Sequence, residues 1–362
     1  MEKIATLRDK IIKTDWLLAL AITVCYIVAA LFIGYYSNLT IPGNSDPLAR
    51  YSQEPATHLD FMSEWDGPHY LAIASHGYSN NSLTAFFPLY PLLIRIVMIV
   101  VRSPLISALI VSWAALTGAV YFYIKIIREL ISKNINDIIL GLFLFLFFPT
   151  GIFLAATYTE SLFAFLGLGA LFYGLKGRVL PAALFTAMAT AAHPEGIFVI
   201  PLVALLLWEA GVNVKKISLT ALLGFSGIAG YICYLWIAKG RPLDFVAAQR
   251  QSNWLSSNYF SIIRSSITTI DVLLLALVGL SVVYWWSRRK SLSIYSFLFF
   301  VLPLIGGNFA GYSRYVLMAF PTQFMLADKL KHKKTAYVTV IITSTMLWSY
   351  FVIHYAAGYT GG

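Results

Sequence analysis

The chain has 362 residues, of which 59% are hydrophobic and only 12% charged, and its formal net charge is +10. Soluble domains usually carry about 25% charged residues, so this composition and the mean hydropathy of +0.75 exclude a soluble globular protein. The apolar residues come in runs of about 17 to 25, long enough to cross a bilayer as helices. A transmembrane β-barrel would alternate apolar and polar residues instead. The sequence therefore predicts an all-α polytopic membrane protein, with residues 1–362 as a single domain.

The basic residues lie in six clusters between the apolar runs. The clusters are Lys3, Arg8, Lys10 and Lys13; Lys125, Arg128 and Lys133; Lys176 and Arg178; Lys215 and Lys216; Arg288, Arg289 and Lys290; and Lys329, Lys331, Lys333 and Lys334. This placement follows the positive-inside rule for cytoplasmic loops. It indicates topology and contact with membrane lipid, and we expect no nucleic-acid partner.

The N-terminal basic flank leads into an apolar run from about Trp16 to Tyr36. This run is too long for a cleavable signal peptide, so we expect an uncleaved first span with the N-terminus in the cytoplasm. A long extracytoplasmic loop of about residues 37–103 should follow.

The apolar stretch Ala85–Val101 within this loop resembles a second span. However, Pro88 and Pro91 interrupt its first turns, and Arg95 would place a costly charge in the middle of the bilayer. If the stretch crossed, the next basic cluster would also lie outside, away from the other five. We therefore predict an interfacial helix here.

Ten further spans complete a prediction of about eleven. They are expected near residues 104–126, 138–156, 159–175, 180–193, 196–209, 218–238, 260–286, 292–306, 315–328 and 335–356. In this arrangement 18 of the 26 Lys and Arg residues face the cytoplasm.

Three acids, Asp60, Glu64 and Asp66, lie within seven residues of the first loop. On a helix Asp60 and Glu64 would share one face, where repulsion raises a carboxylate pKa and favours a general base. A solvated acidic loop explains the same residues equally well. The neighbouring candidates for substrate binding are Trp65, His69 and Tyr70.

Later turns on the same side carry more polar groups. Glu160 begins a predicted span, where burial of an acid is energetically costly and therefore indicates a functional role. The alternative is that Glu160 caps the N-terminus of the helix. His193 and Glu195 form another turn and are candidates for substrate binding, but we do not expect His193 to act as a base.

Cations on the outer side oppose the positive-inside trend. Arg241 and Arg250 share a loop with Gln249 and Trp254, and Arg314 directly precedes an apolar run. Phosphate binding would explain these arginines, with contact to lipid headgroups as the alternative. Gln249 and Trp254 are candidates for substrate binding.

Two classes of function fit this set. A lipid-phosphate-dependent transferase needs an outer base, an outer cation and aromatic side chains. A transporter or flippase of lipid-linked sugars needs charges near the middle of the bilayer, where Asp271 is the main candidate. The polar residues gather on one side, which favours an enzyme.

Several motifs resemble the PIG-V mannosyltransferase family. The more specific pair is Glu64-Trp-Asp-Gly-Pro-His-Tyr-Leu-Ala-Ile-Ala-Ser-His-Gly-Tyr78 and Ala85-Phe-Phe-Pro-Leu-Tyr-Pro-Leu-Leu-Ile-Arg95. Weaker similarities follow in the same order at Tyr158–Phe163, Pro242–Trp254 and Ser313–Pro321. The chain departs from the family at Ala192-His-Pro-Glu-Gly196, where Arg-Ser-Asn-Gly is usual, and it is shorter than the animal members. We therefore expect a prokaryotic homologue.

The resemblance implies a GT-C glycosyltransferase fold and a polyprenyl-phosphate sugar donor, typically dolichyl-phosphate mannose. It implies an acid in the first outer loop that acts on a glycolipid or glycan acceptor, with inversion at the anomeric carbon. We expect Asp66 to be this base, with Glu64 and Asp60 as alternatives, and Glu160 to position a substrate. The donor phosphate is expected on Arg314.

Arg241 and Arg250 come next as phosphate ligands. No cofactor is required, although the acidic loop leaves room for a divalent metal. The expected location is the plasma membrane of a prokaryote, or the endoplasmic reticulum membrane of a eukaryote, with the active site extracytoplasmic. A third alternative is a catalytically silent partner subunit, which would have the fold without a complete active site.

Overall fold

The computed structural model describes residues 2–41, 58–252, 254, 267–306, 309 and 311–359, with the backbone alone for 2–13 and 334. All regular secondary structure in these residues is helical. The α-helices are α1 (Glu2–Thr40), α2 (Gly67–His76), α3 (Leu89–Val101), α4 (Pro104–Leu130), α5 (Ile135–Leu146), α6 (Glu160–Leu175), α7 (Val179–Ala192), α8 (Val199–Glu209), α9 (Val214–Gly224), α10 (Ser226–Lys239), α11 (Asp244–Gln251), α13 (Thr269–Trp286), α14 (Lys290–Gly306), α15 (Tyr312–Met318), α16 (Phe320–Leu330) and α17 (Lys334–Ala356). The 3₁₀ helices are η2 (Asp60–Met62), η3 (Asn81–Ala85), η4 (Gly151–Leu154) and η5 (Pro194–Phe198).

Five helical segments of the described chain are long and apolar enough to cross a bilayer. They are Thr14–Thr40, Pro104–Leu130, Val214–Lys239, Thr269–Trp286 and Thr335–Ala356. Several shorter apolar helices, including α5, α6, α7 and α14, lie among them. The prediction of an all-α polytopic membrane protein is confirmed. The number of eleven spans stays a prediction, and the start of the span expected at residue 260 lies outside the described residues.

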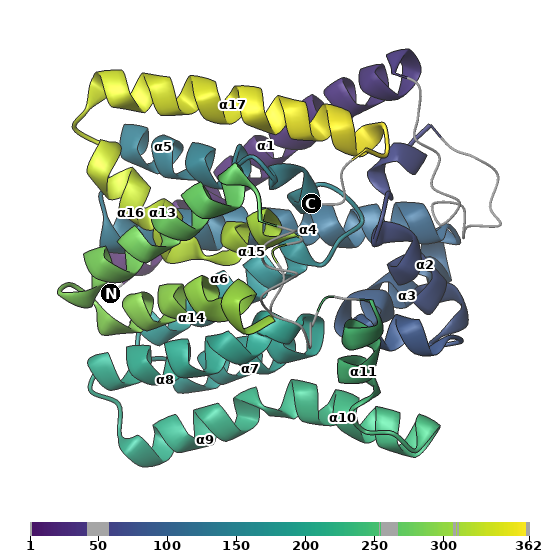
Figure 1. The fold of residues 1–362 in the computed structure, drawn as a ribbon. Coiled ribbons are helices and arrows are strands. Elements are labelled where there is room, and N and C mark those ends of the chain that lie inside the picture. The colour runs from purple at the N-terminus through teal and green to yellow at the C-terminus, as the bar shows by residue number, and fades with distance from the viewer. Residues whose placement is uncertain are drawn as a thin grey trace.

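The basic clusters gather at one end of the helical bundle. Ion pairs join several of them: Asp15 with Lys125 at 2.6 Å and Arg128 at 2.5 Å, Glu129 with Lys176 at 2.6 Å, and Glu209 with Arg289 at 3.6 Å. The turns from α8 to α9 and from α16 to α17 lie at this same end (Figure 1). The fold thus separates a basic end from the end that carries α2, α3 and α11.

Helix α3 covers part of the stretch expected to lie along the membrane surface. It begins at Leu89 rather than Ala85, because residues 81–85 form η3 and Pro88 occupies the N-cap position. Its inner face is buried at Tyr90 and Ile94, whereas Val100 is 83% exposed. This amphipathic helix suits a membrane surface, but its depth in a bilayer stays a prediction.

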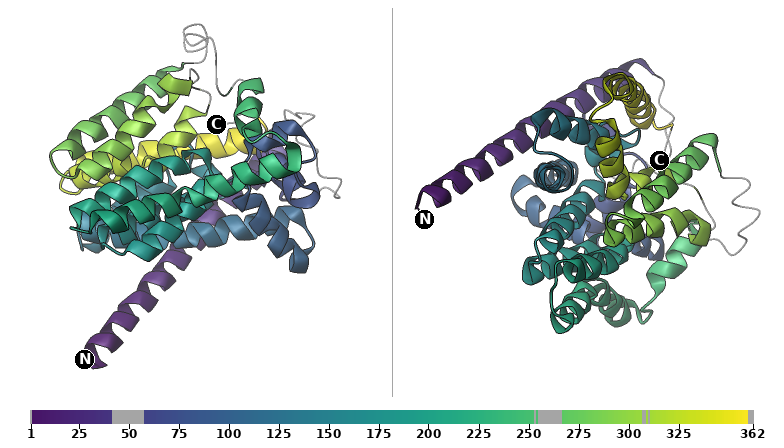
Figure 2. Two further views of the ribbon diagram at one scale, coloured as in Figure 1. Left: turned by 90° about the horizontal axis from the view of Figure 1, so that it is seen from below. Right: turned by 90° about the vertical axis from the view of Figure 1, so that its left-hand side faces the viewer.

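Helix α1 packs against α4 and α17. Its N-terminal end projects beyond the rest of the bundle in both views of Figure 2. Apolar side chains on its outer face are exposed, among them Leu17 at 58% and Phe32 at 73%. Such a surface is expected to face lipid, which does not penalise exposed apolar side chains.

Aromatic side chains fill the interior where α4, α5 and α16 meet. Tyr123 stacks on Phe145 with ring centroids 4.8 Å apart and contacts Phe324 at 5.1 Å. All three rings are fully buried, and such rings contribute large apolar areas to a core. The interior here is packed with side chains.

Candidate active site

A strained turn precedes α2. Trp65 has φ of +57°, a left-handed conformation that costs a non-glycine residue about 1–3 kcal/mol. The Tyr158 hydroxyl donates to the Glu64 carbonyl at 3.0 Å and accepts from the Asp66 N–H at 3.0 Å. The Glu64 N–H donates to the Tyr355 hydroxyl at 3.1 Å. Two buried tyrosines therefore hold the turn that presents Asp66.

Gly67 is the residue that lets this turn pack closely. A Cβ at this position would lie 2.5 Å from Thr157 Oγ1 and 2.7 Å from Ser63 Oγ, so any side chain there would force these hydroxyls to shift. Asp66 is the N-cap residue of α2, yet its side chain makes no capping hydrogen bond. The carboxylate is therefore available for other partners.

Arg314 on α15 pairs with two carboxylates at once. Its NH1 donates to Asp66 Oδ2 at 2.8 Å, and its Nε lies 3.1 Å from Glu160 Oε1. The Arg314 and Glu160 side chains are 11% and 3% exposed. Breaking a buried ion pair typically costs several kcal/mol, so Arg314 fixes both acids in place.

Aromatic rings surround the guanidinium. Its carbon lies 5.4 Å from the ring centre of Tyr158, 5.5 Å from Phe153 and 5.7 Å from Tyr315. Such contacts stabilise a cation most strongly when it is shielded from water. They also hold Arg314 in a single orientation.

A second ion pair lies in the turn between α7 and α8, where His193 Nδ1 contacts Glu195 Oε2. Burial lowers the pKa of His193, but the Glu195 carboxylate outweighs it, so this pKa is raised overall. Burial alone would raise the pKa of Glu195, but the His193 cation lowers it. Gly196 keeps the turn tight, because a Cβ there would lie 2.2 Å from the Ala189 carbonyl oxygen.

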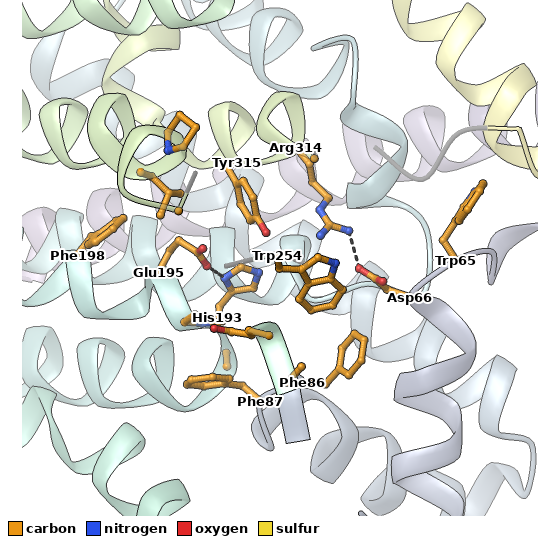
Figure 3. Close-up of a pocket in the computed structure, with 18 of the residues that line it drawn as sticks. Trp65, Asp66, Phe86, Phe87, His193, Glu195, Phe198, Trp254, Arg314 and Tyr315 are labelled. Atoms are coloured by element: carbon orange, nitrogen blue, oxygen red, sulfur yellow. Dashed lines mark hydrogen bonds and ion pairs between the residues drawn. The ribbon is translucent and has the colours of Figure 1, made fainter. Parts of the chain in front are cut away.

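Both ion pairs face one cavity of about 480 Å³, which Figure 3 shows. The lining residues are Trp65, Asp66, Tyr70, Ala85, Phe86, Phe87, Ala192, His193, Pro194, Glu195, Phe198, Gln249, Trp254, Leu302, Pro303, Gly306, Gly311, Arg314 and Tyr315. Cavities of about 300–1,000 Å³ hold small-molecule ligands. Asp66, the expected base, is thus on the wall of a cavity of suitable size.

Phe86 is the centre of an aromatic wall. The ring of Trp254 meets it edge-on at 5.6 Å, and Tyr70 does so at 5.0 Å. His69, a residue expected to bind substrate, lies 5.0 Å from Phe86 by ring centroids but does not line the cavity. Flat apolar rings beside polar groups are a suitable surface for a sugar.

Asp60 and Glu64 do not line this cavity. Asp60 is exposed in η2, and Glu64 is partly buried within the turn. The expectation that the two acids share a helical face is wrong, because η2 ends at Met62 and α2 begins only at Gly67. Asp66 is the one acid of the three on the cavity wall.

Glu160 begins α6 and also pairs with Arg314, so it combines the two roles considered for it. It does not line the cavity. Its contact with the guanidinium links Glu160 to the cavity through Arg314.

Arg241 and Arg250 lie outside the cavity lining. Arg241 is 68% exposed and lies 3.7 Å from Asp244, and Arg250 is exposed on α11. Asp271, considered a mid-membrane charge, is instead the third residue of α13 and forms a capping box with Thr268. Its charge is therefore used at a helix end.

Sequence reasoning did not single out several residues that shape the site. Tyr158 and Tyr315 belong to the motifs Tyr158–Phe163 and Ser313–Pro321, but their contacts become visible only in three dimensions. Phe86 and Phe87 belong to the Phe-Phe-Pro motif, whose resemblance to a family gave no role for each ring.

Among the described residues, no group of three or more His, Cys, Asp or Glu side chains could hold a metal ion. Chemically, the cavity offers a carboxylate with one oxygen paired to Arg314, a His–Glu ion pair and an aromatic wall.

Comparison with known proteins identifies relatives of this chain. Residues 38–210 match the family described as mannosyltransferase (PIG-V). The GPI alpha-1,6-mannosyltransferase 2 of Cricetulus griseus is 33% identical over 153 residues, and that of Homo sapiens is 32% identical over 148 residues. Each alignment covers 38% of this chain and 30% of the relative's length. The matched segment contains Asp66, Glu160, His193 and Glu195, and over this segment the chain is similar to the mannosyltransferase (PIG-V) family.

Proposed function

We propose that this protein transfers mannose, or a related sugar, from a polyprenyl-phosphate donor to a glycolipid or glycan acceptor, with inversion. The observation that carries the proposal is Asp66 on the wall of the cavity, held by Arg314 at 2.8 Å. Similarity to the mannosyltransferase (PIG-V) family supports sugar transfer, and the relatives' names specify mannose. The glycosylphosphatidylinositol acceptor in those names stays with the relatives, since the alignments cover 30% of their length.

The proposed step moves one proton and one sugar. An acceptor hydroxyl oxygen attacks the anomeric carbon while Asp66 takes the hydroxyl proton. The bond from the anomeric carbon to the phosphate oxygen breaks, and its electron pair stays on that oxygen. The transition state resembles an oxocarbenium ion. The products are the glycosylated acceptor and a polyprenyl phosphate.

The geometry of Asp66 suits this role. Oδ2 accepts from Arg314, which leaves Oδ1 for a substrate hydroxyl. A general base must come within hydrogen-bond reach of the proton that it removes, and a fixed backbone helps to provide this. The Tyr158 hydroxyl supplies that fixation through the Glu64 carbonyl and the Asp66 N–H.

The aromatic wall supports a sugar and its lipid carrier as ligands. Phe86 and Trp254 present apolar rings next to the polar groups of Asp66 and Gln249. A sugar ring has C–H groups on its faces and hydroxyls at its edge, so it needs both kinds of surface. No cofactor enters this step, and we propose that none is needed.

Packing of the interior argues against the transporter alternative. A transporter needs polar groups along a path across the bilayer, yet Tyr123, Phe145 and Phe324 pack together in the bundle interior. A silent partner subunit would not need the strained turn that presents Asp66. Both arguments favour an enzyme.

We further propose that the basic end faces the cytoplasm, according to the positive-inside rule. The cavity and α3 then face the opposite side of the membrane. The site would therefore be extracytoplasmic, where a lipid-linked donor rather than a soluble nucleotide sugar is the natural substrate.

The test is transfer of radiolabelled mannose from polyprenyl-phosphate mannose to endogenous lipid extract. It compares wild type with Asp66→Asn and Asp60→Asn, which make the same change in the same loop. Loss of a general base lowers rates by about 10²–10⁴-fold, so Asp66→Asn should lose transfer and Asp60→Asn should keep it. Equal loss in both variants would remove Asp66 from the role of base. Wild-type transfer in EDTA should stay within about twofold of the untreated rate.

A further inference from the structure

Arg314 already has more negative charge around it than it can neutralise. One guanidinium pairs with two carboxylates, Asp66 at 2.8 Å and Glu160 at 3.1 Å. The three groups together carry a formal charge of −1. A phosphate brought to Arg314 would meet both carboxylates, and like charges at short range disfavour binding. Arg314 is therefore poorly placed to bind an anion.

His193 is the other cation on the cavity wall among the described residues. Its Nδ1 pairs with Glu195, and the ring nitrogen Nε2 has no hydrogen bond within the described part of the chain. Nε2 is thus the nitrogen that can donate to a ligand. The Glu195 carboxylate raises the pKa of His193 and so favours the charged imidazole.

The His193 ring is also fixed in position. It lies 5.3 Å from the ring of Phe163 and 6.4 Å from that of Tyr315, measured between centroids. The close approach of Gly196 to α7 sets the backbone. A preorganised donor of this kind is effective where negative charge develops during a reaction.

We propose that His193 is the residue that contacts the phosphate of the donor, and that Arg314 is a positioning residue for the Asp66 carboxylate. This inference rests on the proposed function, and it moves to His193 the phosphate contact that the sequence predicted for Arg314. In this arrangement Glu195 fixes the His193 imidazole. Arg314 fixes the carboxylates of Asp66 and Glu160.

The chemistry explains why a cation is needed at this place. In the donor the phosphate is a diester with one negative charge. When the bond to the anomeric carbon breaks, the electron pair stays on the phosphate oxygen and the charge of the leaving group grows to −2. A charge-assisted hydrogen bond from His193 Nε2 strengthens as this charge grows, and no proton needs to be transferred to the leaving group.

The first experiment measures binding rather than catalysis. Farnesyl phosphate is titrated by calorimetry into detergent-purified protein, with farnesol as the neutral ligand of the same tail. The variants are His193→Gln, His193→Arg and Arg314→Lys, with Arg241→Gln as a matched loss of an exposed cation. Monodispersity on size-exclusion chromatography checks the fold of each variant.

A charge-assisted hydrogen bond is worth about ten- to hundredfold in affinity. His193→Gln should therefore weaken farnesyl phosphate binding by at least about tenfold and leave farnesol binding unchanged. His193→Arg should restore binding to within about threefold of wild type. Arg314→Lys and Arg241→Gln should bind farnesyl phosphate within about threefold of wild type.

Kinetics supply the second readout. Arg314→Lys keeps the charge but loses the two-nitrogen bridge, so kcat should fall at least about tenfold while the KM for the donor stays within threefold. His193→Gln should raise the KM for the donor as well as lower kcat. A merely structural role for Arg314 would not separate the two constants.

Different failures have different meanings. If His193→Gln binds farnesyl phosphate as wild type does, or if Arg314→Lys loses that binding while His193→Gln keeps it, the division of tasks is overturned and the proposed function stands. If wild type does not prefer farnesyl phosphate to farnesol, the polyprenyl-phosphate donor is refuted together with the inference.

Discussion

The most informative single change is Tyr158→Phe, which removes one hydroxyl and keeps the ring beside Arg314. That hydroxyl makes two hydrogen bonds, with the Glu64 carbonyl and the Asp66 N–H, both 3.0 Å long. Each is worth about 1 kcal/mol, so about 2 kcal/mol is lost. The left-handed Trp65 costs about 1–3 kcal/mol to maintain. The two magnitudes are similar, so the turn should relax when the hydroxyl is removed.

The expected result is a loss of activity that exceeds the loss of stability. If relaxed turns become favoured by about 2 kcal/mol, the fraction with Asp66 in place falls by about thirtyfold, and the transfer rate falls with it. Tyr26→Phe is the matched control, since the Tyr26 hydroxyl also donates to a carbonyl, of Gly151, and accepts from an N–H, of Trp348. Both variants should lose similar thermal stability in detergent.

The assay compares transfer rates at saturating donor with melting temperatures for the two variants. Tyr26→Phe should retain at least about half of the wild-type rate, because a hydroxyl outside the turn affects only stability. A Tyr158→Phe variant that melts like Tyr26→Phe and still transfers at more than half of the wild-type rate would refute the reasoning. The turn would then hold its conformation without the hydroxyl.

Three more outcomes can be checked. Gly67→Ala places a Cβ 2.5 Å from Thr157 Oγ1 and should lower the free energy of unfolding, measured by chemical denaturation, by about 1–3 kcal/mol. The control is Gly230→Ala, whose Cβ would have no atom within 4 Å and should not destabilise the protein. The pKa of His193 is raised, so its ion pair with Glu195 is present below this pKa and is lost as the pH rises through it. Farnesyl phosphate binding by wild type should thus weaken as the pH rises through the raised pKa of His193, whereas binding by His193→Arg should not. A flat wild-type profile would contradict this. Asp15→Asn breaks a buried ion pair at the basic end and should lower the melting temperature, because such losses cost about 3–5 kcal/mol. The KM for the donor should stay constant. A changed KM would show that the basic end and the cavity are coupled.

These tests act on different parts of the molecule. The Tyr158 and Gly67 variants test how the turn presents Asp66, and the pH profile tests the His193–Glu195 pair. Asp15 tests whether the basic end is independent of the cavity, which the packed interior between them predicts.

The sequence by itself determined the helical architecture and its polarity. Apolar runs of sufficient length must become helices in lipid, because the backbone has no other partners there. Charge placement is equally local, because the positions of the basic clusters between the apolar runs predict that they share one end of the bundle. Ion pairs such as Asp15–Lys125 lie at this end. Hydropathy and charge placement can both be read from consecutive residues without knowledge of tertiary contacts.

Only the tertiary structure decided which of the candidate residues meet. Asp66 and Arg314 are separated by 248 positions, and Asp66 and Tyr158 by 92. Whether such side chains touch depends on the rotation of each helix about its axis and on the left-handed conformation of Trp65. The hydropathy pattern predicts neither of these features. For this reason the sequence favoured Asp66 as the base but could not exclude Glu64 or Asp60. It also could not tell an arginine paired with two carboxylates from one free to bind a phosphate.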